Sequence, residues 1–143
     1  MDVFTSLHIS SSALSAQRTR LNVISSNLAN VGTTRTPEGG PYRKRQVVFQ
    51  SSSEGFAQHL DNASKAGVQG VKVSEIRPSQ APLRTVYEPG HPDADENGMV
   101  HLPNIDTMAE MVDMMNATRN YEANASAIQA TKRMALKALE IGR

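Results

Sequence analysis

Proline and glycine divide this chain into three parts. All seven prolines and eight of the nine glycines lie between Gly32 and Pro103. Because these residues interrupt regular structure, the stretches on either side can each form one long helix. The division predicts an α+β protein in which long N- and C-terminal helices, paired as an antiparallel coiled coil, flank a small antiparallel β-rich insert. We expect residues 1–31 plus 104–143 to form the helical domain and residues 32–103 to form the β-rich middle region with long loops.

The stretch before Gly32 carries an apolar stripe with helical spacing. Leucines recur every seven residues, and Ile24 lies on the intervening seam. The leucines are Leu7, Leu14, Leu21 and Leu28. Ser10 and Gln17 occupy seam positions where a coiled coil favours Ile or Val, so the helix should be marginal alone and become ordered on packing. Its other positions are rich in serine and poor in charge, which favours several close neighbours, although a poorly ordered Ser-rich arm is the alternative.

The stretch from Ile105 to Ile141 repeats this pattern. Its apolar residues are spaced by three, four or multiples of these, with acidic residues early and basic residues late, as the helix dipole prefers. Asn104 or Asp106 is the expected N-cap. We expect the first stripe to pack against this second one, within or between subunits. The expected partners on the second stripe are Met111, Met114, Tyr121, Ile128 and Leu139.

The middle region shows strand and turn signals. Short strands are predicted at residues 46–50, 68–76 and 83–87, separated by clusters of proline and glycine. Residues 62–67 fit a loop or a helix equally well. A small antiparallel β element with long connections is therefore expected.

Composition and motifs do not indicate an enzyme or a cofactor site. Asp93, Asp95, Asn97 and Gly98 resemble the start of a calcium loop, but Asn104 stands where a bidentate Glu is required, so a polar turn is favoured. The four histidines are scattered and there is no cysteine, so no metal site is predicted. No catalytic or cofactor-binding residues are assigned.

The charge balance and hydropathy also limit the partners. The formal net charge is +1, so no nucleic-acid partner is expected, and the basic run at residues 43–45 is interpreted as a solvated strand edge. No stretch approaches the roughly 20 apolar residues of a membrane span, and no secretory signal peptide is expected at the start. Direct membrane insertion is therefore not predicted.

A further group of residues lies in the first helix and just after it: Ser12, Ala13, Leu14, Ala16, Gln17, Leu21, Asn22, Ile24, Asn27, Leu28, Ala29, Asn30 and Thr33. This group resembles the N-terminal signature of bacterial flagellar rod and hook proteins, the axial proteins of the flagellum. The middle region resembles the proximal-rod members of that family, and the second helix resembles the family's C-terminal signature. The middle and C-terminal matches include Pro37, Gly39, Gly40, Pro41, Tyr42, Arg43, Glu88, Pro89, Gly90, His91, Pro92, Asp93, Glu110, Met111, Asp113, Met114, Arg119, Tyr121 and Glu122.

The resemblance implies that the terminal helices line a hollow axial tube in the periplasmic part of the basal body, with the β element outside. It implies a structural subunit that transmits torque and surrounds an export channel. The implied partners are copies of the chain, other rod proteins and the flagellar type III export apparatus, by which the chain is exported without a cleavable signal peptide. We count Asn30 with the two stripes as an expected assembly residue.

Two other functions are compatible with parts of the sequence. A cytoplasmic coiled-coil adaptor could bind a peptide at the edge of its β insert. Its helices should then carry charged outer faces, which the serine-rich first helix lacks. An enzyme with a calcium-dependent loop is a more distant alternative, which calorimetry with calcium would test.

Overall fold

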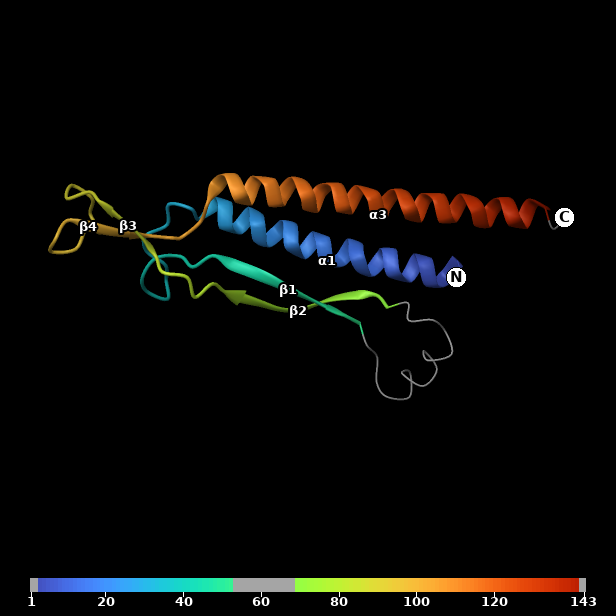
Figure 1. Cartoon of the computed structure of the whole chain (residues 1–143), viewed down its shortest axis with the longest axis horizontal. Coiled ribbons are helices and arrows are strands. Elements are labelled where there is room, and N and C mark those ends of the chain that lie inside the picture. Colours follow the sequence, from blue (N-terminus) through green and yellow to red (C-terminus); the bar gives the residue numbers. More distant parts are fainter. Residues whose placement is uncertain (1–2, 53–68, 142–143) are drawn as a thin grey trace.

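The computed structural model describes residues 3–52 and 69–141. Its elements follow the order α1, β1, β2, β3, β4, α3 (Figure 1). The helices are α1 (Val3–Ala29) and α3 (Thr107–Ile141), and the strands of the described ranges are β1 (Arg45–Ser51), β2 (Val71–Pro78), β3 (Arg84–Tyr87) and β4 (Met99–Leu102). The predicted α+β fold is confirmed, with a long helix at each end and antiparallel strand pairs between them.

The two helices lie side by side and run in opposite directions (Figure 1). The helix α1 has 27 residues and α3 has 35. At 1.5 Å per residue these lengths correspond to about 40 Å and about 52 Å. The end of α3 therefore extends past the start of α1, and both chain ends lie at the same end of the pair.

Local hydrogen bonds define the inner ends of the helices, which are the end of α1 and the start of α3. Asp106 is the N-cap of α3, because its Oδ1 accepts hydrogen bonds from the backbone amides of Met108 at 2.9 Å and Ala109 at 3.3 Å. At the end of α1, the Nδ2 of Asn30 donates to the carbonyl of Ser26 at 2.8 Å. The Ser26 carbonyl also accepts the backbone amide of Asn30 at 3.2 Å, so the side chain adds a second hydrogen bond at the helix end.

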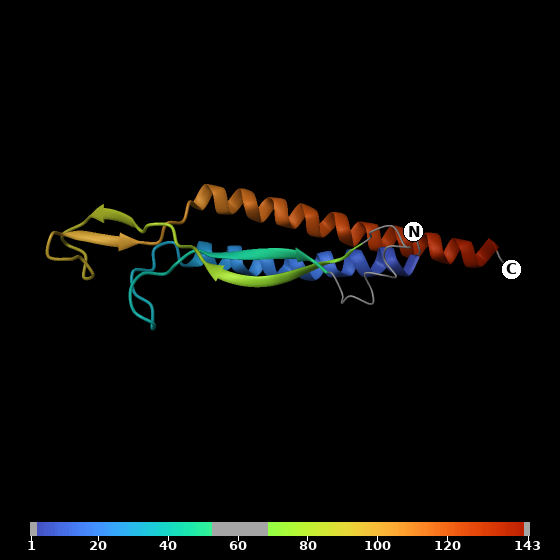
Figure 2. The same ribbon diagram turned by 60° about the horizontal axis from the view of Figure 1, so that its bottom comes forward.

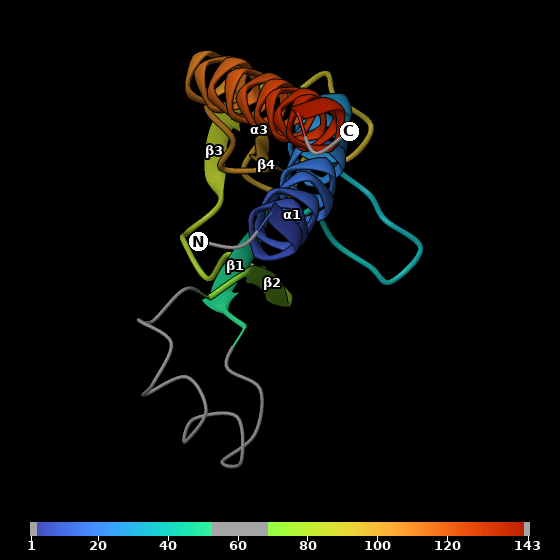
Figure 3. The same cartoon turned by 90° about the vertical axis from the view of Figure 1, so that its right-hand side faces the viewer.

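Helix α1 is the middle layer of the molecule. The strands β1 and β2 run along one side of it, and α3 packs on another side (Figure 2). The end-on view separates these three layers (Figure 3). The backbone approaches closely at Gly70, where an added Cβ would lie 2.9 Å from Ser12 Oγ. The amide of Val71 donates to that same hydroxyl at 3.1 Å, so β2 is bound directly to α1.

The first strand pair is antiparallel and contains one irregularity. Arg45 pairs with Pro78 and Ser51 with Val71, and the register shifts between Val48 and Phe49. The predicted strands at 46–50 and 68–76 thus correspond to β1 and β2, although β2 begins at Val71 and ends two residues later than predicted. Residue 68 and the undecided segment 62–67 lie outside the described residues.

The second strand pair is a hairpin that projects beyond the inner end of the helix pair (Figure 1). Its first strand, β3, was predicted, but β4 was not. Between them Asp95 Oδ1 accepts the amides of Asn97 and Met99, both at 2.9 Å, and Gly98 has a φ of +74°. A positive φ favours glycine, so this segment forms the polar turn between strands that the sequence favoured.

The apolar core is small and is distributed along the length of the molecule. Its buried apolar side chains are Ala16, Val23, Ile24, Tyr42, Val100, Ile105 and Ala117. Among residues 3–52 and 69–141, twelve large apolar side chains are exposed, including Phe4, Met108 and Ile141. Within the described ranges, neither helix has the length and apolarity that crossing a membrane requires.

Candidate assembly surfaces

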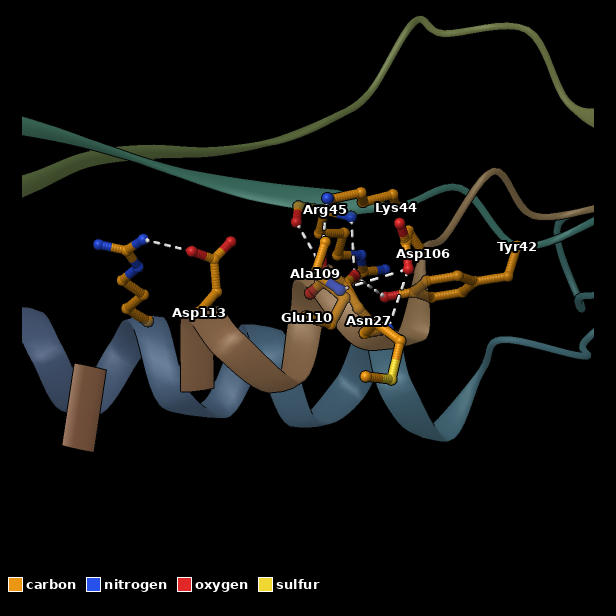
Figure 4. Close-up of polar contacts among 10 residues, drawn as sticks. Asn27, Tyr42, Lys44, Arg45, Asp106, Ala109, Glu110 and Asp113 are labelled. Atoms are coloured by element: carbon orange, nitrogen blue, oxygen red, sulfur yellow. Dashed lines mark hydrogen bonds and ion pairs between the residues drawn. The ribbon is translucent and has the colours of Figure 1, made fainter. Parts of the chain in front are cut away.

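A cluster of polar side chains joins the two helices to the start of β1. We call it the polar hub, and its members are Asn27, Tyr42, Lys44, Arg45 and Glu110 (Figure 4). The Nδ2 of Asn27 donates to the Arg45 carbonyl at 2.9 Å and to Glu110 Oε2 at 3.1 Å. Its Oδ1 accepts the Arg45 amide at 2.9 Å and the Tyr42 hydroxyl at 3.1 Å. One side chain of α1 thus binds three other segments.

The carboxylate of Glu110 is the charged centre of the polar hub. The residue is 1% exposed, and its Oε1 lies 2.6 Å from Lys44 Nζ. A buried carboxylate is tolerated only when donors surround it. Here Lys44 binds Oε1 and Asn27 donates to Oε2. Removing either donor would leave a buried charge without sufficient compensation. The geometry therefore requires α1, α3 and the segment before β1 to form together.

Sequence position explains how the hub residues reach one another. Asn27 lies in the last turn of α1 and Glu110 in the first turn of α3, and these turns are adjacent because the helices are antiparallel. Glu110 is also close to the positive end of the α3 dipole, which favours a carboxylate. A second ion pair, between Arg20 and Asp113 at 3.4 Å, lies one turn further along (Figure 4). Both side chains of that pair are partly exposed, so its contribution is small.

The basic run before β1 differs from the solvated edge that was predicted. Lys44 is bound to Glu110, and only a quarter of its side chain is exposed. The Tyr42 ring is buried, and the guanidinium of Arg45 lies 5.9 Å from its centroid. The prediction was wrong for Lys44 because the partner carboxylate comes from a helix some 65 residues away. Arg43 is exposed, as expected.

The structure places the predicted seam residues unevenly within the single chain. Ile24 is buried, Met111 is 44% exposed and Leu139 is 72% exposed. The remaining members are half-buried, namely Leu7, Leu14, Leu21, Leu28, Met114, Tyr121 and Ile128. Asn30 is also half-buried, and its side chain bonds locally to Ser26 and Thr33. Their role in assembly therefore stays a prediction, and Met111 and Leu139 are exposed in the single chain.

Outside the polar hub, several of the most buried helix positions hold small side chains rather than leucine or methionine. Ala117 is 0% exposed and Ala16 is 3%, while Ser10 and Thr131 are also buried. Small side chains let two helix backbones approach closely, so they occupy the sites that a search for leucine repeats overlooks. Gln17 is a further polar seam residue, and its Oε1 is buried without a hydrogen-bond partner among the described residues. An amide left in this state costs about 1 to 3 kcal/mol.

The acidic turn of the projecting hairpin is bound into the fold. Asp93 Oδ2 accepts the Thr34 hydroxyl at 2.8 Å, and its other oxygen lies 4.0 Å from Arg35. Asp95 caps the turn backbone, as described above. Across residues 3–52 and 69–141, no group of three or more histidine, aspartate or glutamate side chains is placed to hold a metal ion. The carboxylates that suggested calcium therefore serve the hairpin and the loop before β1.

Family models of flagellar rod proteins match both ends of the chain. The family described as "Flagella basal body rod protein" matches residues 7–35, and "Flagellar basal body rod FlgEFG protein C-terminal" matches residues 96–141. These ranges contain most of α1, all of β4 and α3, and two members of the polar hub, Asn27 and Glu110. The hub was missed from the sequence, although both residues belong to the matched signatures.

Three relatives that align over nearly their whole length share one name. The flagellar basal-body rod protein FlgC of Bacillus subtilis is 48% identical, with complete coverage of both chains. The protein of that name from Salmonella typhimurium is 48% identical over 94% of this chain and 93% of its own length, and that from Borreliella burgdorferi is 42% identical over 99% and 98%. The chain therefore belongs to the FlgC family of flagellar basal-body rod proteins.

Proposed function

We propose that the chain is a structural subunit of the proximal part of the flagellar rod, which polymerises through its two helices into a hollow shaft that transmits torque. The observation that carries this proposal is the 48% identity to a basal-body rod protein along the entire chain. Membership in a family of structural rod proteins makes the chain a structural protein and not an enzyme. The comparisons give no support to a cytoplasmic adaptor.

The distribution of apolar side chains supports an assembling subunit. Few large side chains are buried within the chain, whereas Leu139, Met108 and Phe4 are each at least 70% exposed. Covering a Leu, Met or Phe side chain contributes about 1.5 to 3 kcal/mol. Assembly can therefore supply stabilisation that the single chain lacks. We propose that the two predicted stripes, with Asn30, contribute this interface.

We further propose the partners and the location of the chain. Its partners are copies of itself, other rod proteins and the flagellar type III export apparatus, which delivers it to the periplasmic part of the basal body. The helix pair, residues 1–31 plus 104–143, forms the wall around the export channel, and residues 32–103 form an outer domain. The three-layer order supports this arrangement, because α1 separates β1 and β2 from α3.

Deletion and fractionation test this function. Cells without the chain should be non-motile, and a plasmid copy should restore swimming. An epitope tag on the tip of the projecting hairpin should then be recovered with purified basal bodies after the hook and filament are removed. Recovery of the tagged chain in the cytosol alone, in cells that swim normally, would contradict the proposal.

A further inference from the structure

The first three turns of α3 carry a second apolar face. Met108, Met111, Val112 and Met115 are spaced by three and four residues, so they project from one side of the helix. We call this the methionine face. Its exposed fractions are 70%, 44%, 49% and 53%, respectively. Ala117, which is fully buried, lies nine residues after Met108 and thus about 180° around the helix. The methionine face therefore points away from α1.

Within the described ranges, no helix or strand covers the methionine face. Of the elements that the structure describes, only α1 packs against α3, and α3 forms an outer layer in the end-on view (Figure 3). A hollow of about 480 Å³ lies beside the face, lined by Met111, Met114, Met115, Thr118 and Arg119. An apolar stripe on one face of a helix normally packs against a partner. A contiguous apolar patch of this kind marks an interaction surface.

The C-terminal end of α3 also exposes apolar side chains. Met134, Leu136, Leu139 and Ile141 are 63%, 52%, 72% and 85% exposed. This end extends past the start of α1 (Figure 1), so it is a single helix that another subunit can contact. The spacing of the methionine face by three and four residues is that of a helix-binding surface, and methionine side chains adapt to an irregular partner. Charge does not oppose this contact, because Arg119 borders the hollow and the helix end carries one basic and one acidic residue, Lys137 and Glu140.

The two apolar surfaces cannot cover each other within one chain. They lie at opposite ends of a rigid helix of 35 residues, which spans about 52 Å. A contact between two different surfaces of successive subunits generates a filament when the rotation between subunits does not close a ring. This head-to-tail arrangement covers both surfaces with one kind of contact.

We propose that the methionine face binds the C-terminal end of α3 from the axially adjacent rod subunit of the same two-helix architecture. The C-terminal end of this chain, residues 134–141, makes the equivalent contact with the subunit on the other side. The inference rests on the proposed rod function and adds to it the surface and the chemistry of the partner, an apolar helix end.

Photo-crosslinking in assembled basal bodies tests the contact. The photoreactive residue p-benzoylphenylalanine is placed at position 115 and, as a control, at the exposed Tyr87 of the projecting hairpin, where it replaces a similar ring. After irradiation of cells, basal bodies are purified and the crosslinked peptides are identified by mass spectrometry. We expect the probe at 115 to attach to the last turns of the C-terminal helix of a neighbouring subunit, which is another copy of this chain or a related rod protein. The control should attach elsewhere.

The outcomes separate this inference from the rod function. If the chain is present in basal bodies but the probe at 115 attaches to a strand, a loop or a non-rod protein, or attaches to nothing, the inference is overturned and the function stands. If the chain is absent from basal bodies, both fail. A second measurement is independent of the probe: Met115→Asp should lower the amount of chain in basal bodies about tenfold or more, whereas Met115→Leu should change it less than about twofold. Equal recovery of both variants would also overturn the inference.

Discussion

Replacing Asn27 with alanine should weaken the fold at the point where both helices meet β1. The change removes four hydrogen bonds, to the Arg45 amide, the Arg45 carbonyl, the Tyr42 hydroxyl and Glu110. The Glu110 carboxylate is 1% exposed, so water cannot readily replace the lost donor. A hydrogen bond to a buried charge is worth about 1.5 to 3 kcal/mol, and an unpaired backbone amide costs about 1 to 3 kcal/mol. Because the neighbouring groups can partly relax, the net effect should be smaller than the sum of these terms. We expect the free energy of unfolding to fall by about 3 to 4 kcal/mol.

The assay is urea unfolding of the purified monomer, followed by far-UV circular dichroism. Asn30→Ala is the matched control, because it removes another asparagine from the same end of α1. The Asn30 side chain bonds only to nearby groups, the Ser26 carbonyl and the Thr33 hydroxyl, and it is half-buried. Its loss should cost about 1 kcal/mol.

The comparison between the two variants carries the conclusion. A loss for Asn27→Ala that exceeds the control by about 2 kcal/mol or more supports a hub that binds three segments. If the two variants lose equal stability, the hydrogen bonds of Asn27 do not hold the helices to β1 and the reasoning is refuted. A fall in the unfolding free energy of the chain by 3 kcal/mol would be a large part of the 5 to 15 kcal/mol typical of a domain.

Three further changes test separate parts of the structure. Gly70→Val places a side chain against Ser12 Oγ and should lower the free energy of unfolding in urea by about 1 to 3 kcal/mol. Gly32→Val should lower it less, because no atom lies within 4 Å of the added Cβ. Equal losses would contradict the close approach of β2 to α1. Gln17→Leu removes a buried amide oxygen without a partner and should raise the unfolding free energy by about 1 kcal/mol, and a decrease would show that the amide is satisfied. Leu21→Asp should block both entry into the rod and swimming, while Leu21→Met should preserve them, and normal motility of the aspartate variant would refute the proposed seam.

The helices were predictable because their signal is long and redundant. The 31 residues before Gly32 contain no proline or glycine, and this stretch, the repeat of leucines and a capping aspartate all indicate the same elements. The strand β4 was missed for the opposite reason. It has four residues, Met99–Leu102, and its ends are set by Gly98 and by pairing with β3 rather than by its own composition. Short strands gain their stability from cross-strand partners, which the local sequence does not reveal.

The contacts between the helices were harder to predict than the helices themselves. Ranking by hydrophobicity selects leucine and methionine, but the most buried helix positions include Ala16, Ala117 and Thr131. The polar hub was not predicted, because Asn27 and Glu110 are 83 positions apart and neither is apolar. Only the antiparallel pairing brings the buried carboxylate to its donors. A buried network of this kind depends on the whole fold, whereas an apolar stripe can be found within one helix.

Electron cryomicroscopy of purified basal bodies is the most direct test of the central claim. The chain would carry a small tag on the projecting hairpin so that its position in the reconstruction is unambiguous. We expect α1 and α3 to appear as an antiparallel pair in the wall of the rod, around an open channel, with β1 and β2 on the outer side of α1. A rod whose wall contains no density for this helix pair, or a tag located outside the rod, would contradict the account.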